Sequence, residues 1–454
     1  MKIKITIPPK ILFVINLLRN SGYEAGVVGG CTRDSIMGIC PNDWDICTSA
    51  TPKEIQNVFK DFKQLDMGLK HGTIVVIIDN EEIEITTYRI DGTYSDGRRP
   101  DKVNFTRNLI EDLSRRDYTI NAIFYNDEEG IIDPFNGTMD IKNKLIKSVG
   151  NADKRFKEDA LRILRGIRLA SKLGFFIEEN TKKAMFSNKE LLKKISQERI
   201  TIEFIKLIQG KDAVKVLDEF KDIICYIIPE ITPMIGFNQN NPYHIYDVWH
   251  HSLIAVKNTD NLILRLTMLF HDIGKPYCYT LDEKAIGHFY GHEDISAKLT
   301  SEIFKRMKIT NSESLSKDDV KTIIKLIKYH DITIEHNKKD VKKWLFKLDG
   351  DEKLFKLLLE VKKIDTLAKC PKIQDEILNS INTIEVILKE ILAENPCITL
   401  KDLSISGKDL INLGIPKGKK IGEILNILLQ DVINEKIPNN KELLLLEAKK
   451  IKDN

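Results

Sequence analysis

The chain has 454 residues, 42% of them hydrophobic and 30% charged, and its formal net charge is only +3. This length predicts about three domains, and the near-balanced charge excludes a polycation of the histone type. The seven cysteines form no CxxC pair, which argues against a disulfide framework or a cysteine zinc site and fits a reducing cytosol. Neither a signal peptide nor a membrane-spanning run is indicated, so we expect a cytoplasmic protein with no membrane partner.

Short helices and short strands alternate in the first part of the chain. Apolar runs rich in Ile, Val and Thr predict strands, and apolar positions at helical spacing predict helices. Residues 91–104 contain glycines, a proline and mixed charges, which predict a flexible loop. The predicted strands are Tyr23–Val28, Asp43–Thr48, Thr73–Ile78 and Glu82–Arg89, and the predicted helices are residues 11–22, Thr32–Met37, Lys53–Phe59 and Leu109–Ala122.

From about residue 140 the strand signals fade and helical periodicity continues to the end of the chain. The first helices predicted in this part are Asp153–Lys172, Glu178–Lys193 and Gln197–Ile208. The fold class is therefore α+β, with a head that contains a mixed β-sheet and helices, followed by all-α domains. The expected domains are a catalytic head over residues 1–140, a helical neck over 141–235, a body over 236–370 and a helical tail over 371–454.

The first chemical motif surrounds two glycines. Gly29 and Gly30 can adopt φ > 0 and let the backbone approach a ligand closely, and the helix that follows offers N–H groups to an anion. Arg33 on that helix can bind a phosphate through two N–H groups. Asp43 and Asp45 alternate along a predicted strand, so their carboxylates share a face and suit Mg²⁺. This pattern predicts a site for a metal-bound nucleoside triphosphate; the structural alternative is an ordinary turn and an exposed strand end.

Two further charged motifs lie on predicted helices. The helix over residues 109–122 would bring Arg116, Asp117 and Asn121 near one another. The helix over residues 153–172 carries an arginine at every third position, which makes a basic strip with two acids at its start. A solvated, salt-bridged helix face is the alternative for such a run. The residues of this second motif are Glu158, Asp159, Arg162, Arg165 and Arg168.

The order of these motifs resembles that of the class II CCA-adding enzymes, which are tRNA nucleotidyltransferases related to bacterial poly(A) polymerases. The resemblance extends from Gly22 to about Ile208, and Ser406–Gly418 resembles the tail of the bacterial enzymes. It implies template-independent addition of C, C and A to the 3′ end of tRNA from CTP and ATP, with release of pyrophosphate. The motifs are GGCTRD, DWDICTSATP, KHGT, a GRRP loop, DLSRRDYTINA, IIDPFNG and RFKEDALRILRGIRLASKLGF.

The resemblance also implies a role for each motif. Asp43 and Asp45 would be the catalytic residues and would hold two Mg²⁺. Asp159 and Arg162 resemble the pair that reads the Watson–Crick edge shared by C and A and refuses U and G. Glu84 is either a third carboxylate or a solvent-facing strand residue. The implied nucleotide-binding residues are Gly29, Gly30, Arg33, Arg116, Asp117, Asn121, Glu158, Asp159, Arg162, Arg165 and Arg168.

The predicted loop over residues 91–104 carries Arg98 and Arg99. In the family that the chain resembles, a flexible loop at this place assists the switch from C to A addition and is shortened in enzymes that add only C. The loop has its full length here, so we expect addition of both CC and the terminal A. A bacterial poly(A) polymerase and a partial CC- or A-adding enzyme are the alternatives within this class.

Eight of the nine histidines fall between His244 and His336. Neutral imidazole and carboxylate are suitable ligands for Mn²⁺, Fe, Ni²⁺ or Zn²⁺. The segment HDIGK and its surroundings resemble the HD phosphohydrolases, which implies a metal site that activates water for attack on a phosphate ester. The alternative is an HD fold kept as a tRNA-binding scaffold. The implied ligands are His251, His271, Asp272 and Asp365, with His292 and His330 for a second metal.

The expected partners are the acceptor arm and 3′ end of tRNA, together with CTP and ATP. A-form RNA hides its deep groove, so the helical body and tail would bind tRNA by shape and backbone contacts. An alternative from another class is an HD hydrolase whose head only binds a nucleotide, and a third is a tRNA-binding protein without catalysis. The sequence does not indicate an oligomeric state.

Overall fold

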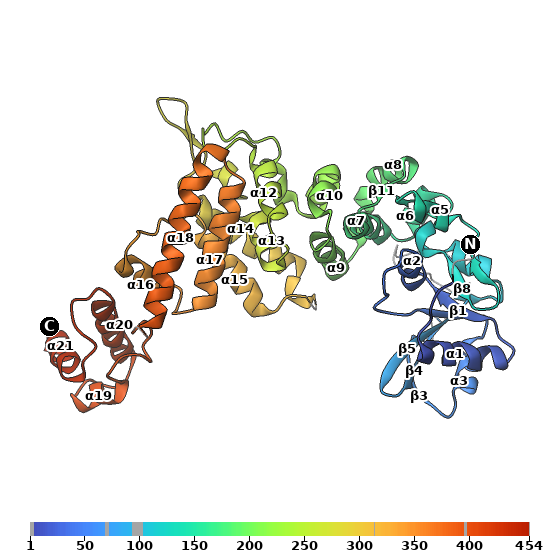
Figure 1. Cartoon of the computed structure of the whole chain (residues 1–454), viewed down its shortest axis with the longest axis horizontal. Helices are drawn as coiled ribbons and strands as arrows, with labels where there is room; N and C mark the ends of the chain where they lie inside the picture. The colour runs from blue at the N-terminus through green and yellow to red at the C-terminus, as the bar shows by residue number, and fades with distance from the viewer. Residues whose placement is uncertain (1–3, 69–71, 93–102, 313, 395–396, 454) are drawn as a thin grey trace. The chain divides into compact units, whose positions relative to one another are not determined.

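The structure is a computed structural model that describes residues 4–68, 72–92, 103–312, 314–394 and 397–453. Its internal contacts divide the chain into two compact units (Figure 1). The first unit comprises Met1–Pro229 with Arg306–Ser312, and the second comprises Glu230–Lys305 with Glu313–Asn454. The first unit contains the large sheet and the second is almost entirely helical, which confirms the predicted α+β class.

A seven-stranded mixed sheet forms the centre of the first unit, with strand order β3-β4-β5-β2-β1-β8-β9. Strands β2 and β5 are parallel, with Ile46 opposite Ile85, and the other neighbours are antiparallel. The strands are β1 (Ala25–Val28), β2 (Ile46–Thr48), β3 (Lys63–Gly68), β4 (Thr73–Ile78), β5 (Glu81–Thr87), β8 (Phe124–Asn126) and β9 (Gly130–Ile132). Short paired strands lie beside it: β6 (Arg89–Asp91) with β7 (Val103–Phe105), and β10 (Leu145–Ile146) with β11 (Phe176–Ile177).

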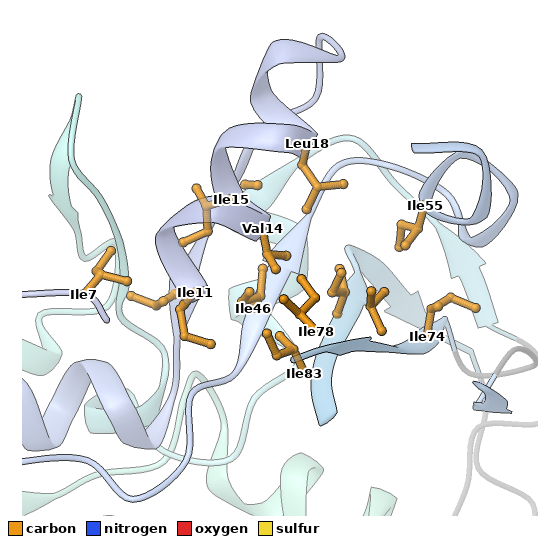
Figure 2. Close-up of a cluster of buried hydrophobic side chains, with 14 of the residues drawn as sticks. Ile7, Ile11, Val14, Ile15, Leu18, Ile46, Ile55, Ile74, Ile78 and Ile83 are labelled. Carbon is orange, nitrogen blue, oxygen red and sulfur yellow. The ribbon is translucent and has the colours of Figure 1, made fainter. Parts of the chain in front are cut away.

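Helices α1 (Pro9–Asn20) and α3 (Pro52–Val58) cover one face of this sheet. The apolar residues of α1 recur at helical spacing, so they lie on one side and are buried against the strands. Figure 2 shows the resulting core, in which isoleucines from helix and sheet interdigitate. The helix contributes Ile11, Val14, Ile15 and Leu18, and the strands contribute Ile46, Ile74, Ile78 and Ile83.

The opposite face of the sheet has its own apolar cluster. Side chains alternate between the two faces of a strand, so Val28 and Cys47 pack here while their neighbours Val27 and Ile46 face the first core. Helix α4 (Leu109–Ser114) covers this cluster with Leu113.

Two predicted helices are interrupted, and the predictions of continuous helices over residues 109–122 and 153–172 are wrong. Helix α4 stops at Ser114, and a 3-10 turn, η2 (Thr119–Asn121), follows. Helices α6 (Ala152–Glu158) and α7 (Leu161–Leu173) are separated by Asp159, whose backbone is extended. Its side chain accepts a hydrogen bond from Leu161 N–H at 3.0 Å, the capping role in which aspartate is favoured.

Helix α9 (Gln197–Ile208) has the predicted bounds and packs against α7. The other helices of the first unit are α2 (Gly30–Ile36), α5 (Gly137–Lys142), α8 (Glu179–Asn188), α10 (Ala213–Glu219) and α11 (Lys221–Ile227).

The second unit is helical, as predicted, apart from one small hairpin of β12 (Thr280–Leu281) and β13 (Gly287–His288). No helix in the described part of the chain is long and apolar enough to cross a membrane. The helices are α12 (Val248–Lys257), α13 (Leu262–Phe270), α14 (His292–Met307), α15 (Lys317–Tyr329), α16 (Lys338–Lys347), α17 (Glu352–Leu367), α18 (Pro371–Ala393), α19 (Gly407–Asn412), α20 (Lys419–Ile433) and α21 (Lys441–Asp453).

Candidate active site

The glycine turn after β1 lies beside two charged side chains that are distant in sequence. Gly29 has φ +84°, a left-handed conformation that favours glycine, and Gly30 begins α2. A Cβ on Gly29 would lie 3.4 Å from Arg116 Nη1 and 3.5 Å from Asp45 Oδ2. Any larger side chain would intrude between them. The turn, a carboxylate and a guanidinium therefore meet at one point of the head.

Strand β2 begins at Ile46, so the prediction that Asp43 and Asp45 lie on a strand is wrong. The backbone at Asp45 still follows β1, because its carbonyl accepts a hydrogen bond from Val28 N–H at 3.1 Å. Both residues are exposed, yet protein atoms displace water around the Asp45 carboxylate, and this raises its pKa. Arg116 opposes that rise and Asp43 adds to it. A cation shared by the two carboxylates would relieve their repulsion.

Glu84 on β5 lines the same cavity as Asp43 and Asp45, which has a volume of about 790 Å³. Ile46 and Ile85 are paired in the parallel ladder. The residues that precede them, Asp45 and Glu84, are therefore neighbours on the opposite face of the sheet. The wall of the cavity thus carries these three carboxylates together with Glu81 and Glu82.

Four of the predicted residues form one chain of polar contacts across three elements. Arg33 donates from Nη1 to Asn121 Oδ1 at 2.6 Å, and Asn121 donates from Nδ2 to Asp117 Oδ1 at 3.2 Å. Arg165 on α7 donates to Asp117 Oδ2 at 2.7 Å. Burial disfavours the charged form of Asp117, but Arg165 and Asn121 hold its pKa well below the usual range. The predicted proximity of Asp117 and Asn121 is present, although a turn rather than a helix produces it.

Asp112 is a residue of the candidate site that the sequence prediction missed. It is fully buried and accepts hydrogen bonds from Arg115 Nη2 at 2.8 Å and Arg116 Nη2 at 3.2 Å. Its other partner is the backbone N–H of Arg89, at 3.2 Å. Asp112 therefore anchors the guanidinium that lies beside Asp45. Its spacing of three and four residues from the two arginines is the signal that could have identified it.

The predicted base-reading pair is held by other side chains. Arg162 donates to Glu158 Oε2 and to the carbonyl of Arg115, both at 3.0 Å. Asp159 is paired with Arg199 on α9, with 2.8 Å between Nη2 and Oδ2. Arg199 was not predicted, because nothing in the sequence of α9 shows which of its polar residues faces the break between α6 and α7.

The basic strip on α7 is not a solvated helix face. Arg165 pairs with Asp117, and Arg168 pairs with Glu203 on α9, with 3.0 Å between Nε and Oε2. Each arginine of the motif therefore has an acidic partner, which is distant in sequence for Arg165 and Arg168 and four residues away for Arg162. The predicted loop residues Arg98 and Arg99 lie outside the described residues, which end at Gly92 and resume at Val103.

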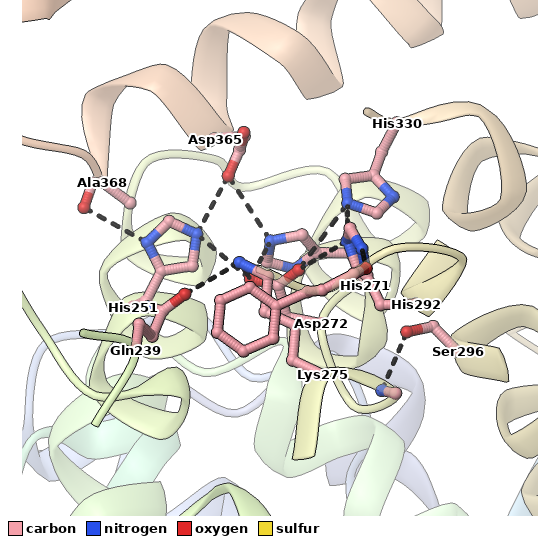
Figure 3. Close-up of polar contacts among 12 residues, drawn as sticks. Gln239, His251, His271, Asp272, Lys275, His292, Ser296, His330, Asp365 and Ala368 are labelled. Carbon is pink, nitrogen blue, oxygen red and sulfur yellow. Dashed lines mark hydrogen bonds and ion pairs between the residues drawn. The ribbon is translucent and has the colours of Figure 1, made fainter. Parts of the chain in front are cut away.

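The second unit brings the six predicted histidine and aspartate residues into one buried cluster (Figure 3). Two groups overlap in it, and the potential ligand atoms within each lie within 4.8 Å of one another. Asp272 belongs to both groups. The first group is His251, His271 and Asp272, joined by Asp365, and the second is Asp272, His292 and His330.

The orientation of the four imidazoles fits a metal site. In each ring Nδ1 lies within hydrogen-bond distance of a backbone carbonyl, at 2.7 to 3.2 Å. The Nε2 atoms face the centre of the cluster, where that of His251 lies 2.9 Å from Asp365 Oδ1 and those of His292 and His330 lie 3.2 Å apart. Metal binding would require these Nε2 atoms to be unprotonated. The carbonyl partners are those of Ala368 for His251, Met268 for His271, Phe289 for His292 and Ile327 for His330.

The polar atoms at the centre of this cluster are incompletely satisfied. In the part of the chain that the structure describes, His271 Nε2 is buried without a hydrogen bond. Asp272 also lacks a hydrogen bond of good geometry, and its carboxylate is held by ion pairs, of which that to Lys275 at 2.7 Å is the shortest. Burial lowers the pKa of His251 and of His330. Burial acts in the same direction on His271, but Asp272 and Asp365 overcome it and raise the pKa of His271 to about 9.

Three protein families match successive parts of the chain. They are described as "Poly A polymerase head domain" over residues 25–147, "Probable RNA and SrmB-binding site of polymerase A" over 174–234, and tRNA nucleotidyltransferase domain 2 over 283–448. None of these descriptions is of an HD phosphohydrolase, so the HD assignment stays a prediction.

Full-length relatives are similar over nearly the whole chain. The CCA-adding enzyme of Ligilactobacillus salivarius is 34% identical over 448 residues, covering 97% of this chain and 96% of that protein. That of Enterococcus faecalis is 32% identical over 438 residues, covering 96% and 94%. The crystal structure of the Bacillus stearothermophilus CCA-adding enzyme in complex with CTP is 28% identical, with a TM-score of 0.66 and coverage of 98% of both chains.

Proposed function

The chain belongs to the CCA-adding enzyme family, and we propose that it adds C, C and A without a template to the 3′ end of tRNA, using CTP and ATP and releasing pyrophosphate. The observation that carries this proposal is the meeting of Gly29, Asp45 and Arg116 at one point. That arrangement can receive a triphosphate, its cation and the attacking hydroxyl together. The sequential use of CTP and ATP follows from the family and not from this geometry.

Asp43 and Asp45 would hold two Mg²⁺, with Glu84 on the same cavity wall as a third carboxylate. When bound, the metal ions would activate the 3′-hydroxyl of the tRNA and stabilise the departing pyrophosphate. The protein's own part is positioning and charge neutralisation. Arg33 and Arg116 supply positive charge for the triphosphate, and the glycines admit it close to the backbone.

Asp159 and Arg162 would select the incoming base. C and A both present an amino donor and a ring-nitrogen acceptor, which a carboxylate and a guanidinium can satisfy together. U and G present a carbonyl and a ring N–H at these places and leave both groups unpaired. In this proposal Glu158 orients Arg162, and Arg199 orients Asp159.

We expect Asp159→Asn to reduce the preference for CTP over UTP by about 10- to 100-fold, since one hydrogen bond to a charged group contributes roughly 1.5–3 kcal/mol. The amide can donate to the carbonyl of uracil, which a carboxylate cannot. Competition between CTP and UTP on a tRNA lacking CCA measures the change. Lys206→Ala, at an exposed position on α9, is the control. An unchanged ratio in Asp159→Asn would remove Asp159 from base selection.

The function as a whole is tested with a tRNA lacking its CCA end, supplied with CTP, ATP or both. Extension that stops after C-C-A supports the proposal. A long A tract would show a poly(A) polymerase, and CC or A alone would show a partial enzyme. In this proposal the head catalyses nucleotide addition and the neck carries the base-selecting residues. The body and tail bind the acceptor arm of the tRNA by its shape.

The buried histidine–aspartate cluster favours a second function for the second unit. We propose that it binds one or two transition metals, such as Mn²⁺, Ni²⁺ or Fe, through His251, His271, Asp272, His292, His330 and Asp365. A metal held there would activate water for hydrolysis of a phosphate ester. The convergence of the imidazoles on Asp272 and the buried His271 Nε2, which lacks a hydrogen bond, support the proposal.

We expect Mn²⁺ to bind to the second unit and His271→Ala to weaken that binding by about 10- to 100-fold or more. Replacing a residue that only hydrogen-bonds to a metal ligand already lowers metal affinity by this factor. Calorimetric titration in an Asp45→Asn background removes one carboxylate of the head cavity, and the binding lost on adding His271→Ala is that of the second unit. His336→Ala, an exposed histidine outside the cluster, is the control. Phosphate release that survives Asp43→Ala but not His271→Ala would support hydrolysis, whereas metal binding without hydrolysis would indicate a scaffold.

A further inference from the structure

Two lysines lie inside the histidine–aspartate cluster and bind its carboxylates. Lys275 Nζ is 2.7 Å from Asp272 Oδ2, and Lys369 Nζ is 2.6 Å from Asp365 Oδ2. Their side chains are only 6% and 18% exposed. A buried carboxylate needs a positive partner, and these ammonium groups supply one for each aspartate.

Lys275 binds the same carboxylate oxygen that a metal ion would use, whereas Lys369 binds Asp365 through Oδ2, and the histidines face Oδ1 of that residue. Asp272 Oδ2, which binds Lys275, is also 3.2 Å from His271 Nε2 and 3.5 Å from His251 Nε2. A divalent cation between these atoms would face an ammonium group bound to one of its own ligand oxygens. Repulsion between the two cations would be strong because the site is buried.

Each lysine can move away from its aspartate without losing all of its polar surroundings. Lys275 also donates to Gln239 Oε1 at 2.9 Å, so it keeps a buried partner when it leaves Asp272 (Figure 3). Lys369 lines a cavity of about 290 Å³ that also contains Asp272, Lys275 and His330. This volume lies just below the roughly 300–1,000 Å³ of ligand pockets, so only a small group such as a phosphate would fit.

We propose that Lys275 and Lys369 are internal counter-cations that exchange with the metal. Divalent metal binding releases both ammonium groups from Asp272 and Asp365, and the released groups then bind a phosphate group in the cavity. Without metal both lysines are neutralised by carboxylates, so the cavity has little free positive charge for an anion. Metal and phosphate therefore bind in that order. This inference rests on the proposed metal site of the second unit.

The test is calorimetric titration of the full chain, in the Asp45→Asn background, with Mn²⁺ alone and then with inorganic phosphate. Phosphate is expected to bind about tenfold more tightly with Mn²⁺ than without it. Lys369→Met removes the competing cation, so it should bind Mn²⁺ about tenfold more tightly and lose the gain in phosphate affinity. Lys372→Met, at an exposed lysine on α18, should resemble the parent chain.

A second measurement uses the parent chain without any change to these lysines, in case Lys369→Met fails to fold. Acylation followed by mass spectrometry should show Lys369 protected in metal-free protein and more reactive with Mn²⁺, with Lys372 unchanged. Mn²⁺ binding that is unaffected by His271→Ala would overturn the metal site itself. Mn²⁺ binding that is lost in His271→Ala, with phosphate affinity and Lys369 reactivity independent of Mn²⁺, would overturn only the exchange.

Discussion

Asp45→Asn is expected to lower the rate of nucleotide addition to tRNA by about 10³-fold or more, comparable to the loss of one preorganised electrostatic contact in an active site. The change removes a negative charge at the point where the glycine turn and Arg116 meet. An amide oxygen is a weaker ligand for Mg²⁺ than a carboxylate oxygen. The NH₂ group of the asparagine would also face the metal ion that accompanies the triphosphate. Single-turnover extension of a tRNA lacking CCA, with saturating CTP, measures the effect.

Asp61→Asn makes the same substitution at an exposed site of the head and serves as the control for Asp45→Asn. It is expected to keep the parental rate. Retention of more than about a tenth of the activity in Asp45→Asn would contradict the assignment, since that loss is below 1.4 kcal/mol of transition-state stabilisation. Thermal unfolding of both variants distinguishes lost chemistry from lost structure.

Asp112→Ala is expected to lower the free energy of unfolding of the first unit by about 3 kcal/mol, the lower end of the range for breaking a buried ion pair. The lower end applies because Arg115 and Arg116 are still 16% and 18% exposed and regain some hydration. The variant should also lose nucleotide addition, because Arg116 loses the acid that holds it beside Asp45. Urea unfolding followed by pulsed hydrogen exchange in β1 and β2 reports on this unit alone.

The stability difference between the parent and Asp112→Ala should depend on pH. Burial disfavours the Asp112 carboxylate, but Arg116 and Arg115 more than compensate and lower its pKa. Its contribution is therefore complete above the unfolded pKa of about 3.9 and is lost as the pH falls through the lower, folded pKa. Asp61→Ala provides an exposed comparison. A difference that grows on acidification would contradict this account of the ion pair.

The sequence predicted that several candidate residues lie close together more reliably than it predicted the local structure around them. Asp117 and Asn121 were expected on one helix, and they are in contact although α4 ends at Ser114. Helical periodicity indicated a continuous helix through Asp159, whereas this residue breaks it and caps α7. Local propensity cannot show that a tertiary partner, here Arg199, stabilises such a break.

Spacing along the chain determined the α+β class, the two motif regions and the type of ligand that each could bind. Glycine pairs, alternating acids and clustered histidines predict anion or metal binding from the chemistry of the residues alone. Only the tertiary structure decided which charges meet. It placed Asp112 beneath Arg116 and Lys275 and Lys369 on the aspartates of the histidine cluster. The physical reason is that a buried charge must find an opposite charge, and packing of distant segments, which no local pattern encodes, determines which one is within reach.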